Sequence, residues 1–227
     1  MSVTKPTNSG VLRTLEQQSD PGLSALVIVD MINDLCHPDG IAAKNRDLLP
    51  VKAIIPRIQA LVTSAKRAAI PVIYVLHTTL PGRVSNSGPW TAAREMALRS
   101  APDLGLDGSW GQAVIDELKP APGDPLIKKF RYSAFRSTPL DRLLRSRGRQ
   151  SAVFTGVSTN VCVMASAHDA LELDYYSIIV EDAMASWDMD LHFAALKMFR
   201  ARYGLTCQTA ELVRLWDAAG NAEKAST

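Results

Sequence analysis

The stretch Ala25-Leu26-Val27-Ile28-Val29-Asp30 is an unbroken run of apolar, mainly branched residues that ends on a carboxylate. Continuous rather than alternating hydrophobicity is typical of a strand buried on both faces, as in a parallel sheet. Similar runs along the chain predict five more strands, at residues 71–76, 125–129, 151–155, 176–180 and 205–207.

Helical periodicity fills the intervals between these strands. Apolar residues recur on one face of residues 54–65. Further helices are predicted at 140–144, 160–173, 191–202 and 209–216. Alternating strands and helices indicate a doubly wound sheet. We therefore expect a single-domain α/β fold, with three α-β-α layers and a mostly parallel six-stranded sheet.

Length and composition set limits on the domain organisation and the partners. The chain has 227 residues, which suits one domain, and 47% of them are hydrophobic. We expect a loosely packed N-terminal arm at 1–22, which could also wrap a neighbouring subunit, then a domain at 23–218 and a tail at 219–227. With 25 basic and 23 acidic residues, the net charge of +2 argues against nucleic acid or an anionic membrane as a partner.

The N-terminal stretch lacks the apolar core of a secretory signal, and no segment reaches the ~18 apolar residues of a membrane helix. We therefore expect a cytoplasmic protein. Its three cysteines cannot all be paired within the chain, and a reducing compartment would keep them as thiols.

Reactive side chains are predicted at one edge of the sheet, because ligands of open α/β sheets bind beyond the carboxyl ends of the strands. Asp30, His77 and Lys129 end or follow three of these strands, and Cys162 follows a fourth. A carboxylate can take the thiol proton, and a nearby ammonium keeps that carboxylate ionised.

Cys162 is the strongest candidate among these residues. Capping residue types at 158–160 place it in the first turn of a helix, where the positive helix terminus is expected to lower the thiol pKa. The competing interpretation is a small buried apolar residue. For Asp30 it is a turn cap, and for Lys129 a surface lysine within a basic cluster. Cys36 and Cys207 are interpreted as structural.

The sequence offers little support for a metal or a cofactor. Its histidines, His37, His77, His168 and His192, form no pair at metal-ligand spacing. There is no phosphate-binding loop, and Gly156 alone is not a dinucleotide motif. We expect neither a metal site nor a cofactor.

Three motifs resemble those of the isochorismatase-like cysteine hydrolases. They are residues 26–31 with Asn33-Asp34, residues 129–135 followed by 138–140, and residues 155–163. Their order and spacing match the family over residues 23–216. The second and third motifs are most similar to those of ureidoacrylate amidohydrolases, and biuret hydrolases are also similar. The histidines of the metal-binding nicotinamidases are missing around residues 39–45.

This resemblance implies a triad of Asp30, Lys129 and Cys162. It also implies a cis peptide bond before Ser158 and an oxyanion hole formed by the backbone N–H groups of Ser158 and Cys162. The implied activity is cysteine-dependent hydrolysis of a linear amide or carbamoyl C–N bond in a small molecule, through a thioester, with release of ammonia or an amine. The family further implies a homodimer or homotetramer.

Substrate contacts are expected from Asn33, His77, Arg131 and Trp187, with the Gly- and Pro-containing insertion at 78–109 as a substrate loop or lid. Two other functions remain open. One is vinyl-ether hydrolysis of the isochorismatase type, and the other is a catalytically silent binding protein on the same fold.

Overall fold

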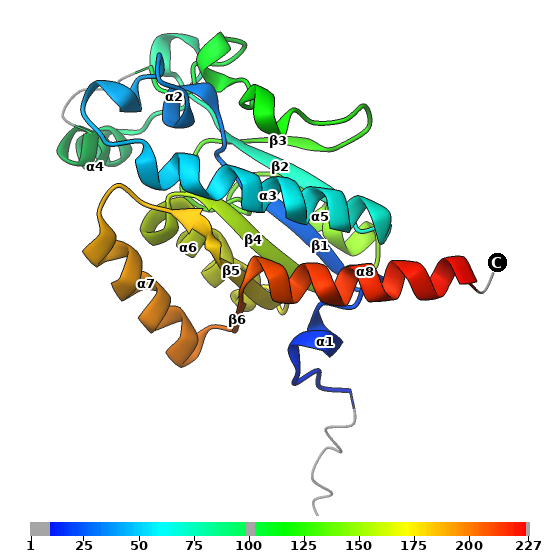
Figure 1. Cartoon of the computed structure of the whole chain (residues 1–227). Helices are drawn as coiled ribbons and strands as arrows, with labels where there is room; N and C mark the ends of the chain where they lie inside the picture. Colours follow the sequence, from blue (N-terminus) through cyan, green and yellow to red (C-terminus); the bar gives the residue numbers. More distant parts are fainter. Residues whose placement is uncertain (1–9, 99–102, 226–227) are drawn as a thin grey trace, which may run out of the picture.

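A six-stranded sheet forms the centre of the computed structural model, which describes residues 10–98 and 103–225 (Figure 1). The strand order is β3-β2-β1-β4-β5-β6, and every neighbouring pair is parallel. The strands are β1 (Ser24–Val29), β2 (Val72–His77), β3 (Leu126–Lys129), β4 (Ser151–Val157), β5 (Tyr176–Ala185) and β6 (Leu205–Cys207). All six predicted strands are thus confirmed, and the fifth runs further than its apolar core suggested.

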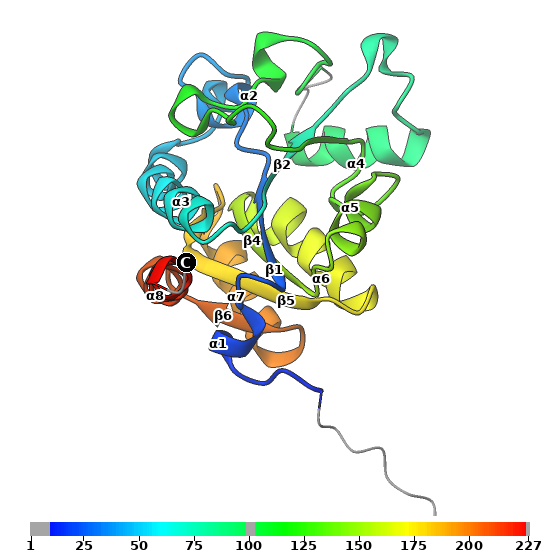
Figure 2. The ribbon, with the colours of Figure 1, turned by 90° about the vertical axis from the view of Figure 1, so that its right-hand side faces the viewer.

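The two faces of the sheet are covered by different helices, because successive side chains of a strand point to opposite faces. Leu26 and Ile28 of β1 pack in one core with α3 (Leu49–Arg67) and α8 (Thr209–Ala225). Val27 and its alternate neighbours pack in the other core. That second face is covered by α5 (Leu140–Ser146), α6 (Met164–Glu172) and α7 (Met189–Arg202), so the fold has the expected three layers (Figure 2).

The strand order places a crevice at the middle of the sheet. The chain runs outward from β1 through β2 to β3, then returns to β4 on the other side of β1 and continues outward to β6. The carboxyl ends of β1 and β4 therefore flank the point where the winding reverses, and this is where ligands of such sheets bind.

Both chain ends differ from the expected arm and tail. The short helix α1 (Leu15–Gln18) is capped by Thr14, and the indole of Trp216 donates a 2.9 Å hydrogen bond to the Ser19 carbonyl oxygen. Residues 10–22 are therefore attached to the domain, whereas residues 1–9 lie outside the described part. At the other end, residues 219–225 of the expected tail are helical, because α8 continues through them.

The insertion between β2 and β3 is more helical than its composition suggested. Within the stretch expected as a substrate loop or lid, α4 (Gly88–Leu98) has 11 residues. The 3₁₀ turns of this region are Pro81–Arg83, Trp110–Gln112 and Asp116–Leu118. A shorter connection holds α2 (Asn33–Cys36) and a 3₁₀ turn at Ala42–Lys44. None of the helices in the described residues has the length and apolarity needed to cross a membrane.

Candidate active site

Asp30 is the first residue after β1, and its side chain is fully buried. Its φ of 55° lies in the left-handed region, which aspartate tolerates better than most residues. The backbone N–H of His77 donates a 2.7 Å hydrogen bond to Asp30 Oδ1. The turn and this bond fix the carboxylate just beyond the ends of β1 and β2.

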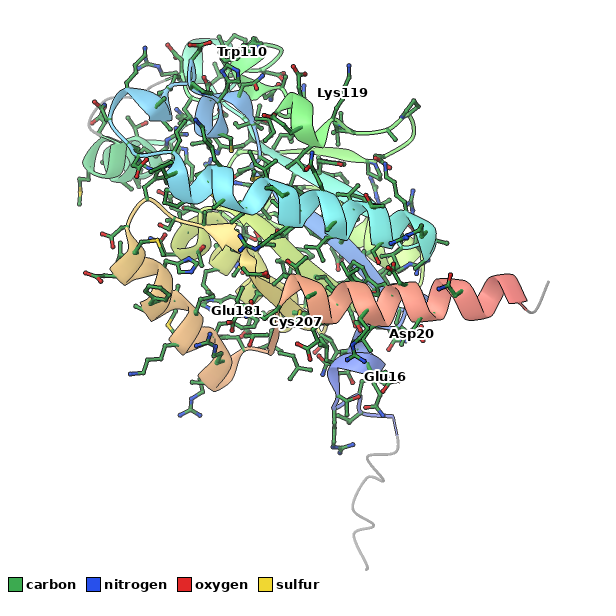
Figure 3. All side chains as sticks on the ribbon, in the orientation of Figure 1. Glu16, Asp20, Trp110, Lys119, Glu181 and Cys207 are labelled. Atoms are coloured by element: carbon green, nitrogen blue, oxygen red, sulfur yellow. The ribbon has the colours of Figure 1, made fainter. Side chains whose placement is uncertain are left out.

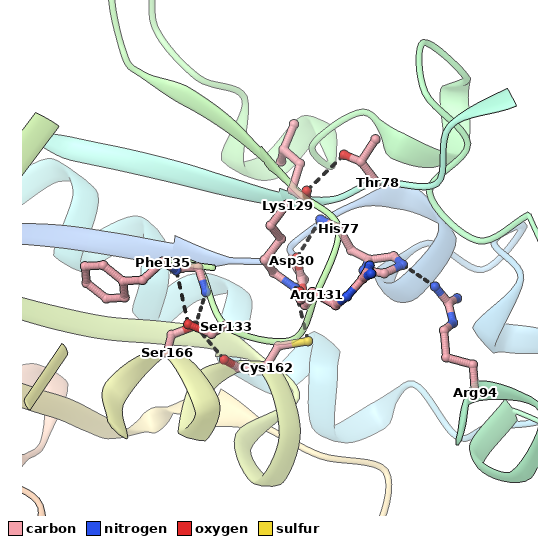
Figure 4. A network of polar contacts seen from close by, with 12 residues as sticks. Asp30, His77, Thr78, Arg94, Lys129, Arg131, Ser133, Phe135, Cys162 and Ser166 are labelled. Atoms are coloured by element: carbon pink, nitrogen blue, oxygen red, sulfur yellow. Dashed lines mark hydrogen bonds and ion pairs between the residues drawn. The ribbon is translucent and has the colours of Figure 1, made fainter. Parts of the chain in front are cut away.

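Lys129 ends the edge strand β3, where exposed and buried residues alternate and Lys129 takes the buried side with Ile127. Its Nζ lies 2.8 Å from Asp30 Oδ2 and 3.2 Å from Cys162 Sγ (Figure 4). Burial alone would lower the pKa of Lys129, but Asp30 and Cys162 outweigh it, and the pKa is raised. The ammonium thus bridges the carboxylate and the sulfur.

Cys162 lies in a π-helical turn, Thr159–Val163, that leads from β4 into α6. Ser166 anchors this turn, since its hydroxyl donates to the Cys162 carbonyl oxygen at 2.6 Å and accepts from the Ala134 N–H at 2.9 Å. These contacts join the cysteine turn to the segment after Lys129. The spacing between sulfur and ammonium is therefore set by backbone on both sides.

The pKa of Cys162 differs from the expectation of a lowered value. Burial, and next the negative charge of Asp30, raise this pKa to about 12, although Lys129 acts in the opposite direction. The positive terminus of the helix does not compensate for these two effects. The resting side chain is accordingly a neutral thiol beside a charged Asp30–Lys129 pair.

The other two thiols are both buried, Cys36 in α2 and Cys207 in β6. Burial raises the pKa of Cys36 strongly and that of Cys207 to about 12. Acidity therefore does not separate the three cysteines. Cys162 differs from the other two because it contacts the Lys129 ammonium and lines a pocket. Figure 3 shows Cys207 far from Trp110, which lies at the opposite end of the molecule.

A pocket of about 550 Å³, its open mouth included, lies over the triad. Its apolar wall is formed by Leu35, Leu104, Val161 and Trp187. Its polar lining is Asp30, Arg46, His77, Arg94, Tyr132, Ser158 and Cys162. The peptide bond between Val157 and Ser158, where β4 reaches the pocket, is cis. The volume suits a small molecule.

His77 and Trp187 line the pocket, as two of the four expected substrate contacts. The ring of His77 is buried, with Nε2 at 2.5 Å from Nη1 of Arg94. Burial, then the charges of Lys129 and Arg94, hold the pKa of His77 well below its usual range. The imidazole is thus neutral, and its Nε2 accepts a hydrogen bond from the Arg94 guanidinium.

Asn33 and Arg131 do not line the pocket within the described residues, so the structure does not support them as substrate contacts. The Asn33 amide donates a 2.8 Å hydrogen bond to the Trp110 carbonyl oxygen. The Arg131 guanidinium donates to the carbonyl oxygens of Phe130 and Ser85, at 2.6 and 3.0 Å. Both side chains hold loops around the site.

Arg94 and Tyr132 line the pocket but were missed by the sequence analysis. Tyr132 lies inside the second motif, so its place there was a usable signal. Arg94 lies in α4, within the insertion, where a Trp-x-x-x-Arg spacing puts Trp90 and Arg94 on one helix face. In the described part of the chain, no three His, Cys, Asp or Glu side chains are grouped as a metal site would require.

Comparison with known proteins identifies a family for the chain. The family model "Isochorismatase domain" matches residues 24–211. The chain belongs to the isochorismatase family. The match includes Asp30, Lys129 and Cys162, so the family domain contains the whole site.

Several solved structures are similar to the chain. A cysteine hydrolase from Pseudomonas syringae pv. phaseolicola has a TM-score of 0.81 and 25% identity, covering 94% of this chain and all of that one. N-carbamoylsarcosine amidase from Thermoplasma acidophilum has a TM-score of 0.66 and 28% identity, covering 82% and 96%. Nicotinamidase from Bacillus subtilis, at 23% identity and a TM-score of 0.68, covering 82% and 99%, shares the fold.

Proposed function

We propose that this isochorismatase-family protein is a cysteine-dependent amidohydrolase that cleaves a linear C–N bond in a small amide or carbamoyl compound. One observation carries the proposal: at the floor of the pocket, Lys129 Nζ contacts both the Asp30 carboxylate and the Cys162 sulfur. Such an arrangement suits a thiol that is activated only when it attacks.

The first step transfers a proton and forms a C–S bond. Asp30 takes the proton of the Cys162 thiol as the sulfur attacks the substrate carbonyl carbon. Because the thiol pKa is about 12, the free thiolate is scarce at neutral pH, and proton transfer accompanies the attack. Lys129 stabilises the negative charge on sulfur during this transfer.

The carbonyl oxygen becomes an oxyanion, which the backbone N–H groups of Ser158 and Cys162 would bind. Removing one donor of this kind from an enzyme lowers the catalytic rate about 10²- to 10³-fold. Asp30 then returns the proton to the leaving nitrogen as the C–N bond breaks, giving ammonia or an amine and a thioester on Cys162. A water, deprotonated by Asp30, hydrolyses the thioester and restores the thiol.

Two relatives support the reaction class. One similar structure is a cysteine hydrolase, and another is N-carbamoylsarcosine amidase. The compound N-carbamoylsarcosine contains a carbamoyl group. Ureidoacrylate and biuret are substrates of the same chemical kind, and the second and third sequence motifs favour them. We also propose a homodimer or homotetramer, to which the exposed apolar side chains of α7, among them Leu191 and Phe193, would contribute.

An ammonia-release screen over primary amides and ureido compounds tests the proposal. A positive substrate is then mixed with enzyme, quenched in acid and analysed by peptide mass spectrometry. We expect the acyl group on the peptide that contains Cys162, and none on Cys36 or Cys207. Cys207→Ala is the matched control, because Cys207 is buried away from the pocket, and this variant should retain turnover. An acyl group on another residue, or no C–N cleavage in the screen, would contradict the proposal.

A further inference from the structure

We propose that Arg94 binds a carboxylate of the substrate, so that the compound cleaved at Cys162 is a small amide or ureido acid and not a neutral amide. This inference rests on the proposed function, because it names the substrate class of the same pocket. It assigns a specificity-determining role to a residue in the insertion after β2.

Arg94 is a buried cation with unused hydrogen-bonding capacity. Arg94 is only 8% exposed, yet it lines the pocket. Nη1 donates to His77, but Nη2 is buried and has no hydrogen-bond partner within the described residues. A guanidinium presents its N–H groups as a planar fork that matches a carboxylate. Because the Arg94 side chain lines the pocket, this unused hydrogen-bonding capacity lies in the pocket wall.

The protein itself does not neutralise this charge. In residues 10–98 and 103–225, no acidic side chain forms an ion pair with Arg94. The acidic residue on the pocket lining, Asp30, is already paired with Lys129. The hydrogen-bond partner of Arg94, His77, is a neutral acceptor. Burying an unpaired cation is costly, and an anionic group of a ligand would remove that cost.

The position of Arg94 is fixed relative to the triad. His77 bonds Asp30 through its backbone N–H and Arg94 through its ring, so one residue sets both ends of the site (Figure 4). The Arg94 guanidinium also lies 5.8 Å from the ring centre of Trp90. The rings of Trp90 and Tyr132 are in contact, with 4.6 Å between their centres. A short molecule would therefore place a carboxylate on Arg94 and its C–N carbonyl at Cys162.

Arg46 is the other arginine on the pocket lining, and it is set differently. It is partly exposed and stacks over Trp187 at 4.5 Å from the ring centre. Its position at the Trp187 side suits an outer wall. Arg94 is the cation that the pocket buries, and it is therefore the one whose loss should discriminate acids from neutral compounds.

Binding tests the inference without turnover. In a Cys162→Ser background, malonamate, succinamate and glutaramate are titrated by calorimetry beside their methyl esters. We expect at least one acid to bind about 10- to 100-fold more tightly than its ester, the usual range for a hydrogen bond to a charged group. Adding Arg94→Met should abolish this preference for the acid over its ester, and Arg94→Lys should restore part of it.

Arg83→Met is the matched control, because Arg83 lies in the same insertion but is exposed and paired with Asp103. It should keep the preference for the acid. Acids that bind no more tightly than their esters would overturn the inference, as would a preference that survives Arg94→Met. A thermal unfolding curve close to that of the Cys162→Ser protein shows that Arg94→Met is folded.

Turnover by the wild-type protein separates this inference from the proposed function. Arg94-dependent binding of an acid without C–N cleavage of any compound would leave the carboxylate site at Arg94 standing and refute the proposed function. Equal cleavage of acids and esters, with Arg94 dispensable, would refute the inference and leave the amidohydrolase intact.

Discussion

The two charged partners of Cys162 should move its thiol pKa in opposite directions. The pKa of the Cys162 thiol is about 12. The charge of Asp30 raises it, and the charge of Lys129 lowers it. Removing the negative charge with Asp30→Asn should therefore make the thiol more acidic. Removing the positive charge with Lys129→Met should make it less acidic.

The size of the Lys129 effect follows from its distance to the sulfur. Two unit charges at the 3.2 Å separation of Nζ and Sγ interact by about 5 kcal/mol at an effective dielectric constant of about 20. One pKa unit corresponds to about 1.4 kcal/mol, so this is an upper bound of about four units. We expect a shift of at least about one unit in each variant, which changes the thiolate fraction about tenfold at a given pH.

The assay is the rate of iodoacetamide labelling at Cys162 between pH 7 and 10, read by peptide mass spectrometry. At pH 8, Asp30→Asn should be labelled at least about tenfold faster than wild type and Lys129→Met at least about tenfold slower. Lys128→Met is the matched control. Lys128 neighbours Lys129 in β3 but is half-exposed and pairs with Asp107, so its loss should not change the rate.

Hydrolysis should respond differently from labelling. Both Asp30→Asn and Lys129→Met should lose turnover, although Asp30→Asn has the more acidic thiol, because the carboxylate is also the proton acceptor. Labelling rates that shift in the same direction in both variants, or that do not change, would refute the assigned electrostatics. Turnover retained in Asp30→Asn would refute its role as a base.

Further predictions concern stability and assembly. Either Asp30→Asn or Lys129→Met should cost about 3–5 kcal/mol in urea unfolding, because one buried charge stays unpaired, and the double variant should recover much of it; a double variant as unstable as the sum of the singles would contradict this. Gly156→Ala should destabilise by more than about 1 kcal/mol, since φ is 109° and a Cβ would collide with the Val29 carbonyl oxygen, whereas Gly88→Ala meets no atom and should change little; equal effects would refute the argument. Light scattering should give the mass of a dimer or tetramer, and a monomer at micromolar concentration would contradict the proposed assembly.

The sheet was predictable because parallel strands buried on both faces leave a strong local signal. The run at 25–29 needs no partner to be recognised, and the position of Asp30 at its end follows from the chain alone. The position of Lys129 at the carboxyl end of a strand was also predictable from the sequence. Its complete burial comes from the exposed-buried alternation of the edge strand β3, which a short basic sequence hides.

The direction of a side chain beyond a strand end was not predictable. Asn33 and Arg131 follow the right strands, but their polar groups bond the carbonyl oxygens of neighbouring loops instead of facing the pocket. Trp110 and Ser85 lie 77 and 46 residues away along the chain, so no local pattern specifies these two bonds. Arg94 was missed for the converse reason, because the tertiary contact with His77 gives an ordinary helical arginine its place.

The thiol pKa shows where local reasoning fails physically. A helix terminus is visible in the sequence, and it favours the thiolate at Cys162. Burial and the nearness of Asp30 appear only in the folded chain, and together they dominate. The sequence therefore indicated a cysteine next to a carboxylate and an ammonium, but not the direction in which the fold shifts the thiol pKa.

The central claim is that Cys162 is the nucleophile, and the turnover rate of Cys162→Ala tests it most directly. With a substrate identified by ammonia release, and with a thermal unfolding curve showing that the variant is folded, we predict a rate at least about 10³-fold below wild type. A Cys162→Ala variant that hydrolyses the substrate within tenfold of the wild-type rate would contradict the account.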